Sequence, residues 1–87
     1  MRYRIEIKKS AQKEIARLPR REQRRVLGAI AALASEPRPQ GVRKIVGDEK
    51  ACRIRVRDYR VVYRIAERVL IVFVIRVGHR KDVYRRL

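Results

Sequence analysis

The sequence predicts an α+β domain, in which a small antiparallel sheet carries a pair of N-terminal helices on one face and a short C-terminal helix. Three observations carry this prediction. A short alternating segment opens the chain, two stretches with helical spacing follow it, and segments rich in Val, Ile and Tyr come last. The expected order is β-α-α-β-β-β-α. The 87 residues are expected to form a single domain, residues 1–87.

The N-terminal half is expected to form one strand and two helices. Apolar and charged residues alternate from Tyr3 to Lys8, which indicates a strand with one buried face. Ser10 is suited to cap the start of a first helix, which ends at Pro19. Apolar residues at helical spacing predict a second helix over about Arg20–Ser35. A segment with two prolines and a glycine then breaks that helix.

The C-terminal half is expected to supply the rest of the sheet. Val42–Val46 favours a short extended piece that ends at Gly47, and a hairpin rich in arginine follows it. Val69–Val77 is almost continuously apolar, which is typical of a central strand covered on both faces. Residues 79–87 are long enough for a short terminal helix.

The hairpin of residues 52–65 is the most informative part of the chain. Its arginines recur at alternate positions, and a two-residue turn at Asp58 and Tyr59 would bring all of them to one face. Arg57 would then lie opposite Arg60. The arginines on this face are Arg53, Arg55, Arg57, Arg60 and Arg64. Like charges placed opposite each other destabilise a sheet, so we expect a polyanion to bind there.

The charge balance also indicates an anionic partner. The chain has 25 Lys and Arg against 9 Asp and Glu, which gives a formal net charge of +16. This charge implies salt-dependent attraction to phosphate, or a tightly bound acidic protein. Two alternatives stay open: a GC-rich genome also enriches arginine, and the charged block Arg20–Arg25 is also explained as a solvated helix face. The hydrophobic fraction of 46% excludes a disordered chain.

Composition excludes other classes of protein. The single cysteine, Cys52, rules out a disulfide framework and a cysteine-based zinc site, and it is expected to pack as a small apolar residue. The chain has no histidine pair and no Gly-rich phosphate loop, so we expect no cofactor and no metal. It opens without a signal-peptide core, and its longest apolar run, Val69–Ile75, is too short to cross a membrane. The expected location is the cytoplasm, with no membrane partner.

Three segments together resemble the RelE branch of the RelE/ParE toxin superfamily. They are the stretch Lys44–Gly47, the hairpin Arg53–Tyr63 and the ending Val77–Tyr84, and the resemblance extends over essentially the whole chain. It implies a microbial ribonuclease-like fold and the toxin half of a type II toxin–antitoxin system. The implied activity is metal-independent, ribosome-dependent cleavage of mRNA in the A site. The ribose 2′-hydroxyl attacks the adjacent phosphate, which leaves a 2′,3′-cyclic phosphate and a 5′-hydroxyl and inhibits translation.

The resemblance also implies a set of catalytic residues. The family's basic pair before the turn falls on Arg53 and Arg55, and its arginine after the turn falls on Arg60. The arginine after the glycine is Arg80, and the tyrosine of the final helix is Tyr84. Several members have lysine in place of the first two. Arginine effectively keeps its proton, so a general-base role of such a lysine cannot pass to this chain.

The reaction needs charge stabilisation and two proton transfers. Arginine suits the developing phosphate charge, so Arg60 and Arg80 are assigned to it first. Proton transfer suits a group that titrates nearer neutrality, and His79 is the only histidine; alternatively, its ring only packs locally. Tyr84 either stacks on a base or packs the terminal helix. Further contacts to RNA are expected from Lys44, Arg57, Arg64 and Lys81.

The expected partners are an acidic RelB-like antitoxin, the ribosome and mRNA. The antitoxin is expected to bind through an acidic amphipathic segment. The complex is expected to be a heterotetramer that binds operator DNA through the antitoxin and not through this chain. Two other functions stay open. One is a ParE-like poison of DNA gyrase, and the other is a non-enzymatic basic protein that binds RNA or the ribosome.

Overall fold

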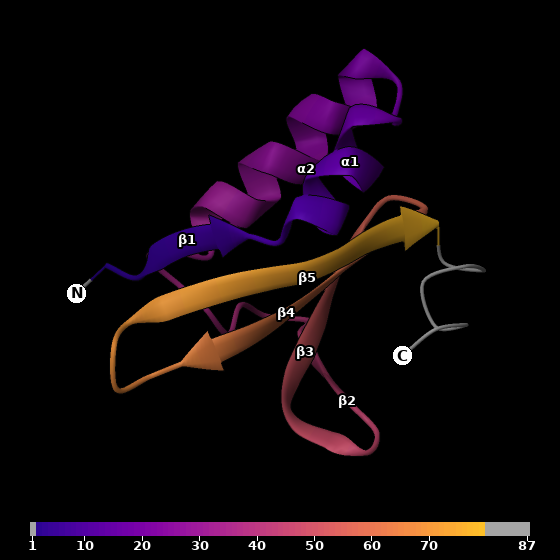
Figure 1. The fold of residues 1–87 in the computed structure, drawn as a ribbon. Helices are drawn as coiled ribbons and strands as arrows, with labels where there is room; N and C mark the ends of the chain where they lie inside the picture. Colours follow the sequence, from indigo (N-terminus) through magenta and orange to yellow (C-terminus); the bar gives the residue numbers. More distant parts are fainter. Residues whose placement is uncertain (1, 80–87) are drawn as a thin grey trace.

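Two helices cover one face of a five-stranded sheet in the computed structural model, which describes residues 2–79 (Figure 1). The strand order across the sheet is β1-β5-β4-β3-β2. The elements in chain order are β1 (Arg4–Ile7), α1 (Lys9–Ala16), α2 (Arg20–Ala32), β2 (Arg43–Ile45), β3 (Asp48–Val56), β4 (Tyr59–Ala66) and β5 (Ile71–His79). The expected C-terminal helix falls on residues that lie outside the described range.

The sheet is mixed, whereas the sequence predicted an antiparallel one. Strands β2 to β5 pair antiparallel, but β1 runs parallel to β5, with Ile5 opposite Val72 and Ile7 opposite Val74. A parallel pair needs a long crossover, and the two helices and three strands between β1 and β5 provide it. The α+β class is therefore confirmed, and the exclusively antiparallel sheet is corrected.

The hydrophobic core lies between the helices and the sheet. Its fully buried side chains include Val26 and Ile30 from α2 and Tyr63 from β4. The side chains of β5 alternate between buried and exposed: Val72 and Val74 are inaccessible to solvent, while Phe73 between them is 36% exposed. The prediction that this strand is covered on both faces is therefore wrong for Phe73, because residues 2–79 place both helices on the other face.

Both helices begin or end differently from the sequence expectation. Helix α1 starts at Lys9, so Ser10 lies inside it, and Lys8 holds the N-cap position without a side-chain cap. The backbone N–H of Lys8 donates to Val74 O at 2.8 Å, which continues the parallel ladder up to the first helical turn. Helix α2 ends at Ala32, and its last turn tightens into i→i+3 hydrogen bonds that reach Ser35. Neither helix is long and apolar enough to cross a bilayer.

Candidate functional site

The arginine hairpin forms, but with a different register from the expected one. The turn residues are Arg57 and Asp58, so Val56 pairs with Tyr59 and Arg55 with Arg60. Arg57 accordingly has a left-handed backbone, with φ of 58°. Tyr59 belongs to β4 and not to the turn, because its ring packs against the core. The pairing moves by two positions, which keeps the strand side chains on their expected faces. Arg57 is the exception, because it lies in the turn and not opposite Arg60 as predicted.

Four arginines line a cleft at the free edge of β3. Strand β2 pairs with β3 only as far as Arg53, so the last residues of β3 have a neighbour on one side alone. The cleft has a volume of about 650 Å³ and continues from there to the C-terminal half of α2 and the loop after it. Its charged lining residues are Glu36, Arg43, Arg53, Arg55 and Arg60.

The four arginines form two like-charged cross-strand pairs. Arg43 lies opposite Arg53 between β2 and β3, and Arg55 lies opposite Arg60 between β3 and β4. Directly opposed like charges destabilise a sheet, and two adjacent pairs repeat that cost. A bound phosphate would relieve both repulsions at once, because guanidinium groups hold phosphate oxygens by charge and by paired hydrogen bonds.

Arg60 is the best prepared of the four to bind an anion. Its side chain is half-buried, and its Nη1 donates a long hydrogen bond of 3.4 Å to Tyr59 O. Its Nε is buried and has no hydrogen-bond partner among residues 2–79. A buried donor without an acceptor is costly, so an incoming phosphate oxygen would satisfy a group that the fold has already removed from water.

One wall of the cleft is held in place by a buried tyrosine. Tyr63 is inaccessible to solvent, and its hydroxyl donates to Pro37 O at 2.7 Å. Burial raises the pKa of Tyr63, so the hydroxyl keeps the proton that this bond requires. The loop continues through Gly41, whose φ of 90° is a conformation that glycine adopts without strain. This contact links the core of the sheet to the rim of the site.

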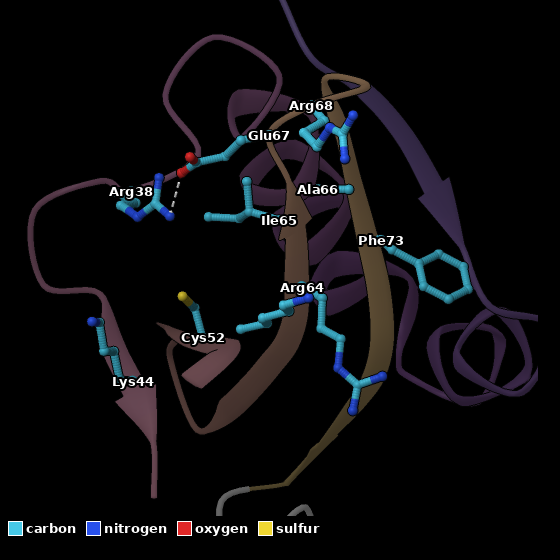
Figure 2. Close-up of a pocket in the computed structure, with 10 residues that line it drawn as sticks. Arg38, Lys44, Cys52, Arg64, Ile65, Ala66, Glu67, Arg68 and Phe73 are labelled. Atoms are coloured by element: carbon cyan, nitrogen blue, oxygen red, sulfur yellow. Dashed lines mark ion pairs between the residues drawn. The ribbon is translucent and has the colours of Figure 1, made fainter. Parts of the chain in front are cut away.

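Two of the predicted RNA contacts line a second cavity. Lys44 and Arg64 lie around a space of about 580 Å³ on the other half of β4, together with Arg38, Lys50 and Arg68 (Figure 2). Part of its wall is apolar and includes Cys52, which is buried as expected and whose pKa burial raises. Arg57, the third predicted contact in the described range, is exposed in the hairpin turn.

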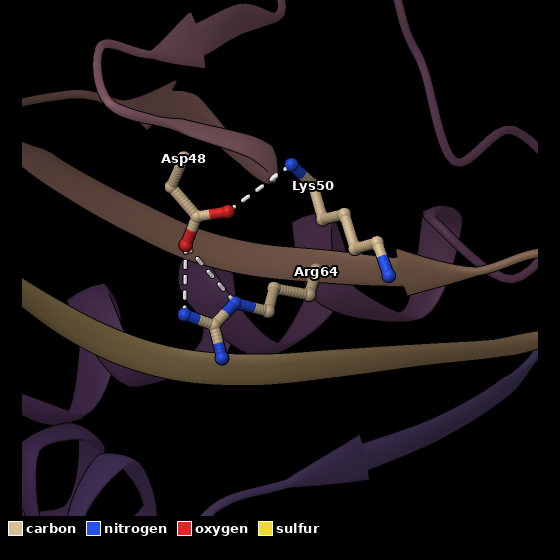
Figure 3. Close-up of polar contacts among 3 residues, drawn as sticks. All are labelled: Asp48, Lys50 and Arg64. Carbon is tan, nitrogen blue, oxygen red and sulfur yellow. Dashed lines mark hydrogen bonds and ion pairs between the residues drawn. The ribbon is translucent and has the colours of Figure 1, made fainter.

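Carboxylates of the chain itself already engage cations of the second cavity. Arg64 Nη2 and Nε donate to Asp48 Oδ2 at 2.7 and 3.2 Å, while the Lys50 backbone N–H donates to Asp48 Oδ1 (Figure 3). The hydrogen bond from Arg64 lowers the pKa of Asp48. Arg38 pairs with Glu67 at 2.6 Å. These pairs reduce the attraction of the second cavity for phosphate, and they favour the cleft as the principal anion site.

His79 stands beside the hairpin turn and is not part of the cleft lining. It pairs with Tyr59 at the end of β5, and the two rings meet edge to face with centroids 6.1 Å apart. Gly78, one position earlier, pairs with Arg60. Successive residues of a strand point to opposite faces, so the His79 ring lies on the face away from the Arg60 side chain.

The remaining predicted site residues, Arg80, Lys81 and Tyr84, lie outside the described residues. Conversely, the structure adds Arg43 and Glu36, which sequence reasoning missed. Arg43 alternates with Lys44 in the short extended piece, and only the pairing with Arg53 shows which of the two faces the cleft. Glu36 comes from the loop after α2, and no periodic pattern marks it.

Comparisons with known proteins point to one superfamily. The family model described as the ParE toxin of type II toxin–antitoxin systems, parDE, matches residues 5–84. A comparison with curated proteins found no match.

Solved structures of RelE toxins are similar over nearly the full chain. The archaeal RelE–RelB complex from Pyrococcus horikoshii is 30% identical with a TM-score of 0.82, covering 95% of this chain and 100% of that one. The RelBE2 complex from Mycobacterium tuberculosis is 26% identical with a TM-score of 0.80, covering 92% and 100%. The intact RelBE complex from E. coli is 26% identical with a TM-score of 0.78, covering 88% and 95%. Together with the family match, these similarities show that the chain belongs to the RelE branch of the RelE/ParE superfamily of type II toxin–antitoxin toxins.

Proposed function

We propose that this toxin is a ribosome-dependent endonuclease that cuts mRNA in the A site. The observation that carries the proposal is the pair of opposed arginines, Arg55 and Arg60, in one cleft with Arg43 and Arg53. Opposed like charges favour the binding of an anion, and the arrangement suits the extra negative charge of a five-coordinate phosphorus. Attack by the ribose 2′-hydroxyl on that phosphorus breaks the bond to the 5′-oxygen.

The cleft arginines supply electrostatic stabilisation in this reaction. Arg60 and Arg55 contact the phosphate oxygens, and Arg53 supports them from the adjacent position on β3. Arg80 and Tyr84, outside the described residues, remain proposed members of the site from the family resemblance. Because arginine is a poor general base, the ribosome is proposed to contribute by holding the mRNA in line for attack. The remaining proposed RNA contacts are Lys44, Arg57, Arg64 and Lys81.

The proposed protein partner is an acidic antitoxin. The similar structures from Pyrococcus horikoshii, Mycobacterium tuberculosis and E. coli are complexes of RelE with RelB, or toxin–antitoxin complexes. A net charge of +16 favours an acidic binding segment by the same Coulomb attraction that would hold RNA. Contact with operator DNA is proposed to run through the antitoxin.

Cleavage on and off the ribosome tests the proposal. The purified toxin should cut mRNA on programmed ribosomes at A-site positions, and it should cut the same naked transcript at least about 100-fold more slowly, because only the ribosome orients the phosphate. Primer extension maps the cuts, and end analysis should find a 2′,3′-cyclic phosphate and a 5′-hydroxyl. Equal rates on naked and ribosome-bound mRNA would refute ribosome dependence.

A ParE-like action on DNA gyrase is the second candidate, since the matching family model carries the ParE description. The two functions differ in what expression does to a cell. The endonuclease halts translation within minutes of induction, whereas a gyrase poison induces DNA damage first. The discriminating measurement is the order in which protein synthesis falls and DNA breaks appear.

Proton transfer by His79 is disfavoured by its place on the face away from the Arg60 side chain, and a pH profile decides between that role and local packing against Tyr59. If His79 transfers a proton, replacing it by alanine should slow cleavage by more than tenfold and change the shape of the pH profile, because general acid–base catalysis typically contributes about 10²–10⁴-fold. The single-turnover rate is measured from acid to neutral pH on programmed ribosomes. A smaller loss with an unchanged profile would leave His79 as a packing partner of Tyr59.

A further inference from the structure

The last part of β5 extends beyond its neighbouring strand on one side. Among the described residues, β1 is the partner of β5 on that side, and it ends at Ile7, opposite Val74. Strand β5 itself continues to His79. Figure 1 shows β5 extending past the end of β1, alongside α1. Within residues 2–79, the strand pairing of this last part is therefore with β4 alone.

A bulge turns one backbone N–H of this segment toward the open side. Tyr63 pairs with Val74 and Val61 with Val77, so a step of two residues on β4 matches a step of three on β5. In a regular strand, backbone groups of successive residues point alternately to the two sides, and Val74 O already points outward, where it accepts the N–H of Lys8. The extra residue of the bulge gives Val77 the same outward direction. The Val77 N–H thus faces the open edge and not β4.

A carboxylate from α1 occupies this open edge. Glu14 Oε1 accepts the Val77 N–H at 2.8 Å, and Glu14 Oε2 lies 3.4 Å from Nε of Arg76. The two side chains are mostly buried, with 28% of Glu14 and 20% of Arg76 exposed. Partial burial strengthens such polar contacts, because the local dielectric is lower than that of water. Glu14 therefore replaces the backbone acceptor that a longer β1 would supply.

The packing of α1 holds this carboxylate in place. Glu14 is the one acidic residue of α1, and the helix buries Ala11 and Ile15 in the core. Helix α1 contacts β5 more extensively than it contacts α2. Because the helix is anchored on the core beside β5, Glu14 is a fixed support for the end of the strand and not a mobile surface charge.

The supported segment leads directly to the cleft. Gly78 follows Val77 and pairs with Arg60, the first phosphate contact of the proposed site. Arg80, which is also proposed for that site, follows Gly78 by two positions in the sequence. A shift of the end of β5 would therefore change the position of the strand against which Arg60 is paired and the point at which the chain leaves β5.

We infer that Glu14 is a positioning residue for the proposed cleavage: it fixes the end of β5 and, through Gly78, the place of Arg60 relative to the scissile phosphate. The inference rests on the proposed function. Glu14 is not among the residues that line the cleft, so it acts through the strand and not on the substrate. A misplacement of about 1 Å can slow a reaction by about 10²-fold, so such a support can control the chemical step.

Three substitutions separate the hydrogen bond of Glu14 from its charge. Glu14→Gln keeps an oxygen at the same reach and loses the charge. Glu14→Asp keeps the charge, but its oxygens end about 1.5 Å short of the Val77 N–H. Glu14→Ala loses both. On programmed ribosomes the Ala and Asp variants should lower kcat by about 10–100-fold and leave KM unchanged, whereas Glu14→Gln should stay within about threefold of wild type.

A matched variant controls for the loss of a carboxylate. Glu6→Ala removes an acidic partner of Arg4 on β1, where the two side chains pair at 2.9 Å, and like Glu14→Ala it raises the formal charge from +16 by one, to +17. It should cut at the wild-type rate. A wild-type kcat for Glu14→Ala would overturn the inference. An equal loss in Glu14→Gln and Glu14→Ala would do so as well, since the charge and not the bond to Val77 would then matter.

A double variant distinguishes positioning from general destabilisation. If Glu14 acts through Arg60, adding Glu14→Ala to Arg60→Ala should slow cleavage little beyond Arg60→Ala alone. Rates are compared well below the melting temperature of each variant, so that the unfolded fraction does not contribute. Full additivity of the two losses in free energy would contradict the inference, because the two residues would then act independently.

Hydrogen exchange at the Val77 amide needs no substrate and separates this inference from the proposed function. The amide should exchange at least about tenfold faster in Glu14→Ala and Glu14→Asp than in wild type and Glu14→Gln, because a bonded amide exchanges only when its bond opens. Equal exchange in all four proteins would overturn the inference. If the wild-type toxin fails to cut ribosome-bound mRNA, the proposed function fails, and the exchange rates still decide whether Glu14 fixes the end of β5.

Discussion

Replacing Arg60 by alanine should lower the single-turnover rate of mRNA cleavage on ribosomes by about 10²–10³-fold, the usual loss when one preorganised donor to a transition-state oxyanion is removed. Arg60 lies opposite Arg55 in the cleft, and its buried Nε has no partner among the described residues. The Nε donor of Arg60 is therefore already desolvated before the phosphate binds. The phosphate gains charge only as the 2′-oxygen attacks, so the effect should appear in the rate of the chemical step.

Two further variants identify the cause of that loss. Arg60→Lys keeps the charge but not the planar pair of donors, so its rate should lie between those of wild type and Arg60→Ala. Arg68→Ala removes the same charge from an exposed turn and should cut at the wild-type rate. The melting temperature of Arg60→Ala should not fall, because the opposed pair with Arg55 is removed. A loss below about fivefold would exclude Arg60 from charge stabilisation.

Replacing Tyr63 by alanine should destabilise the domain by about 3–5 kcal/mol, the usual cost of deleting a buried aromatic side chain. Tyr63 is inaccessible to solvent at the centre of the core. A domain of this size has a total stability of roughly 4–13 kcal/mol, so the substitution removes a large part of it. We expect the melting temperature to fall by about 15–30 °C, measured by calorimetry or circular dichroism. A fall below about 5 °C would show that the core relaxes around the cavity.

The matched variant Tyr63→Phe keeps the ring and removes the hydroxyl. Pro37 O then loses its donor, which should cost about 1–2 kcal/mol and loosen the loop at the rim of the cleft. It also has a distinct pH dependence. Burial raises the pKa of Tyr63 above its ordinary value of 10.0, so only the unfolded chain releases this proton near that pH. Wild-type stability should therefore decline above about pH 10 more steeply than that of Tyr63→Phe.

Face assignments in the hairpin could be predicted, although its register could not. Alternation alone places Arg53, Arg55 and Arg60 on the face opposite Ile54, and a shift of two positions preserves that result. The turn itself depends on a tertiary contact, the packing of Tyr59 against the core. A pattern confined to the hairpin carries no information about that contact.

Pairings between distant segments were beyond prediction from local pattern. The parallel contact of β1 with β5 joins segments more than 60 residues apart, and no local periodicity encodes it. The place of Arg43 in the cleft could not be predicted either. Strand β2 is too short for alternation to define its faces. The start of α1 was missed because the parallel ladder with β5 continues up to Lys8, so the helix begins at Lys9, before the expected cap residue Ser10.

The proposed mechanism requires Arg55 and Arg60 to act on one phosphate, and a double-mutant cycle measures this directly. Single-turnover cleavage of ribosome-bound mRNA is compared for wild type, Arg55→Ala, Arg60→Ala and the double variant. Residues that stabilise the same charge act as a unit, so the double variant should lose little more than the worse single variant. Losses that multiply would contradict this mechanism, because they would show that the two guanidinium groups act independently.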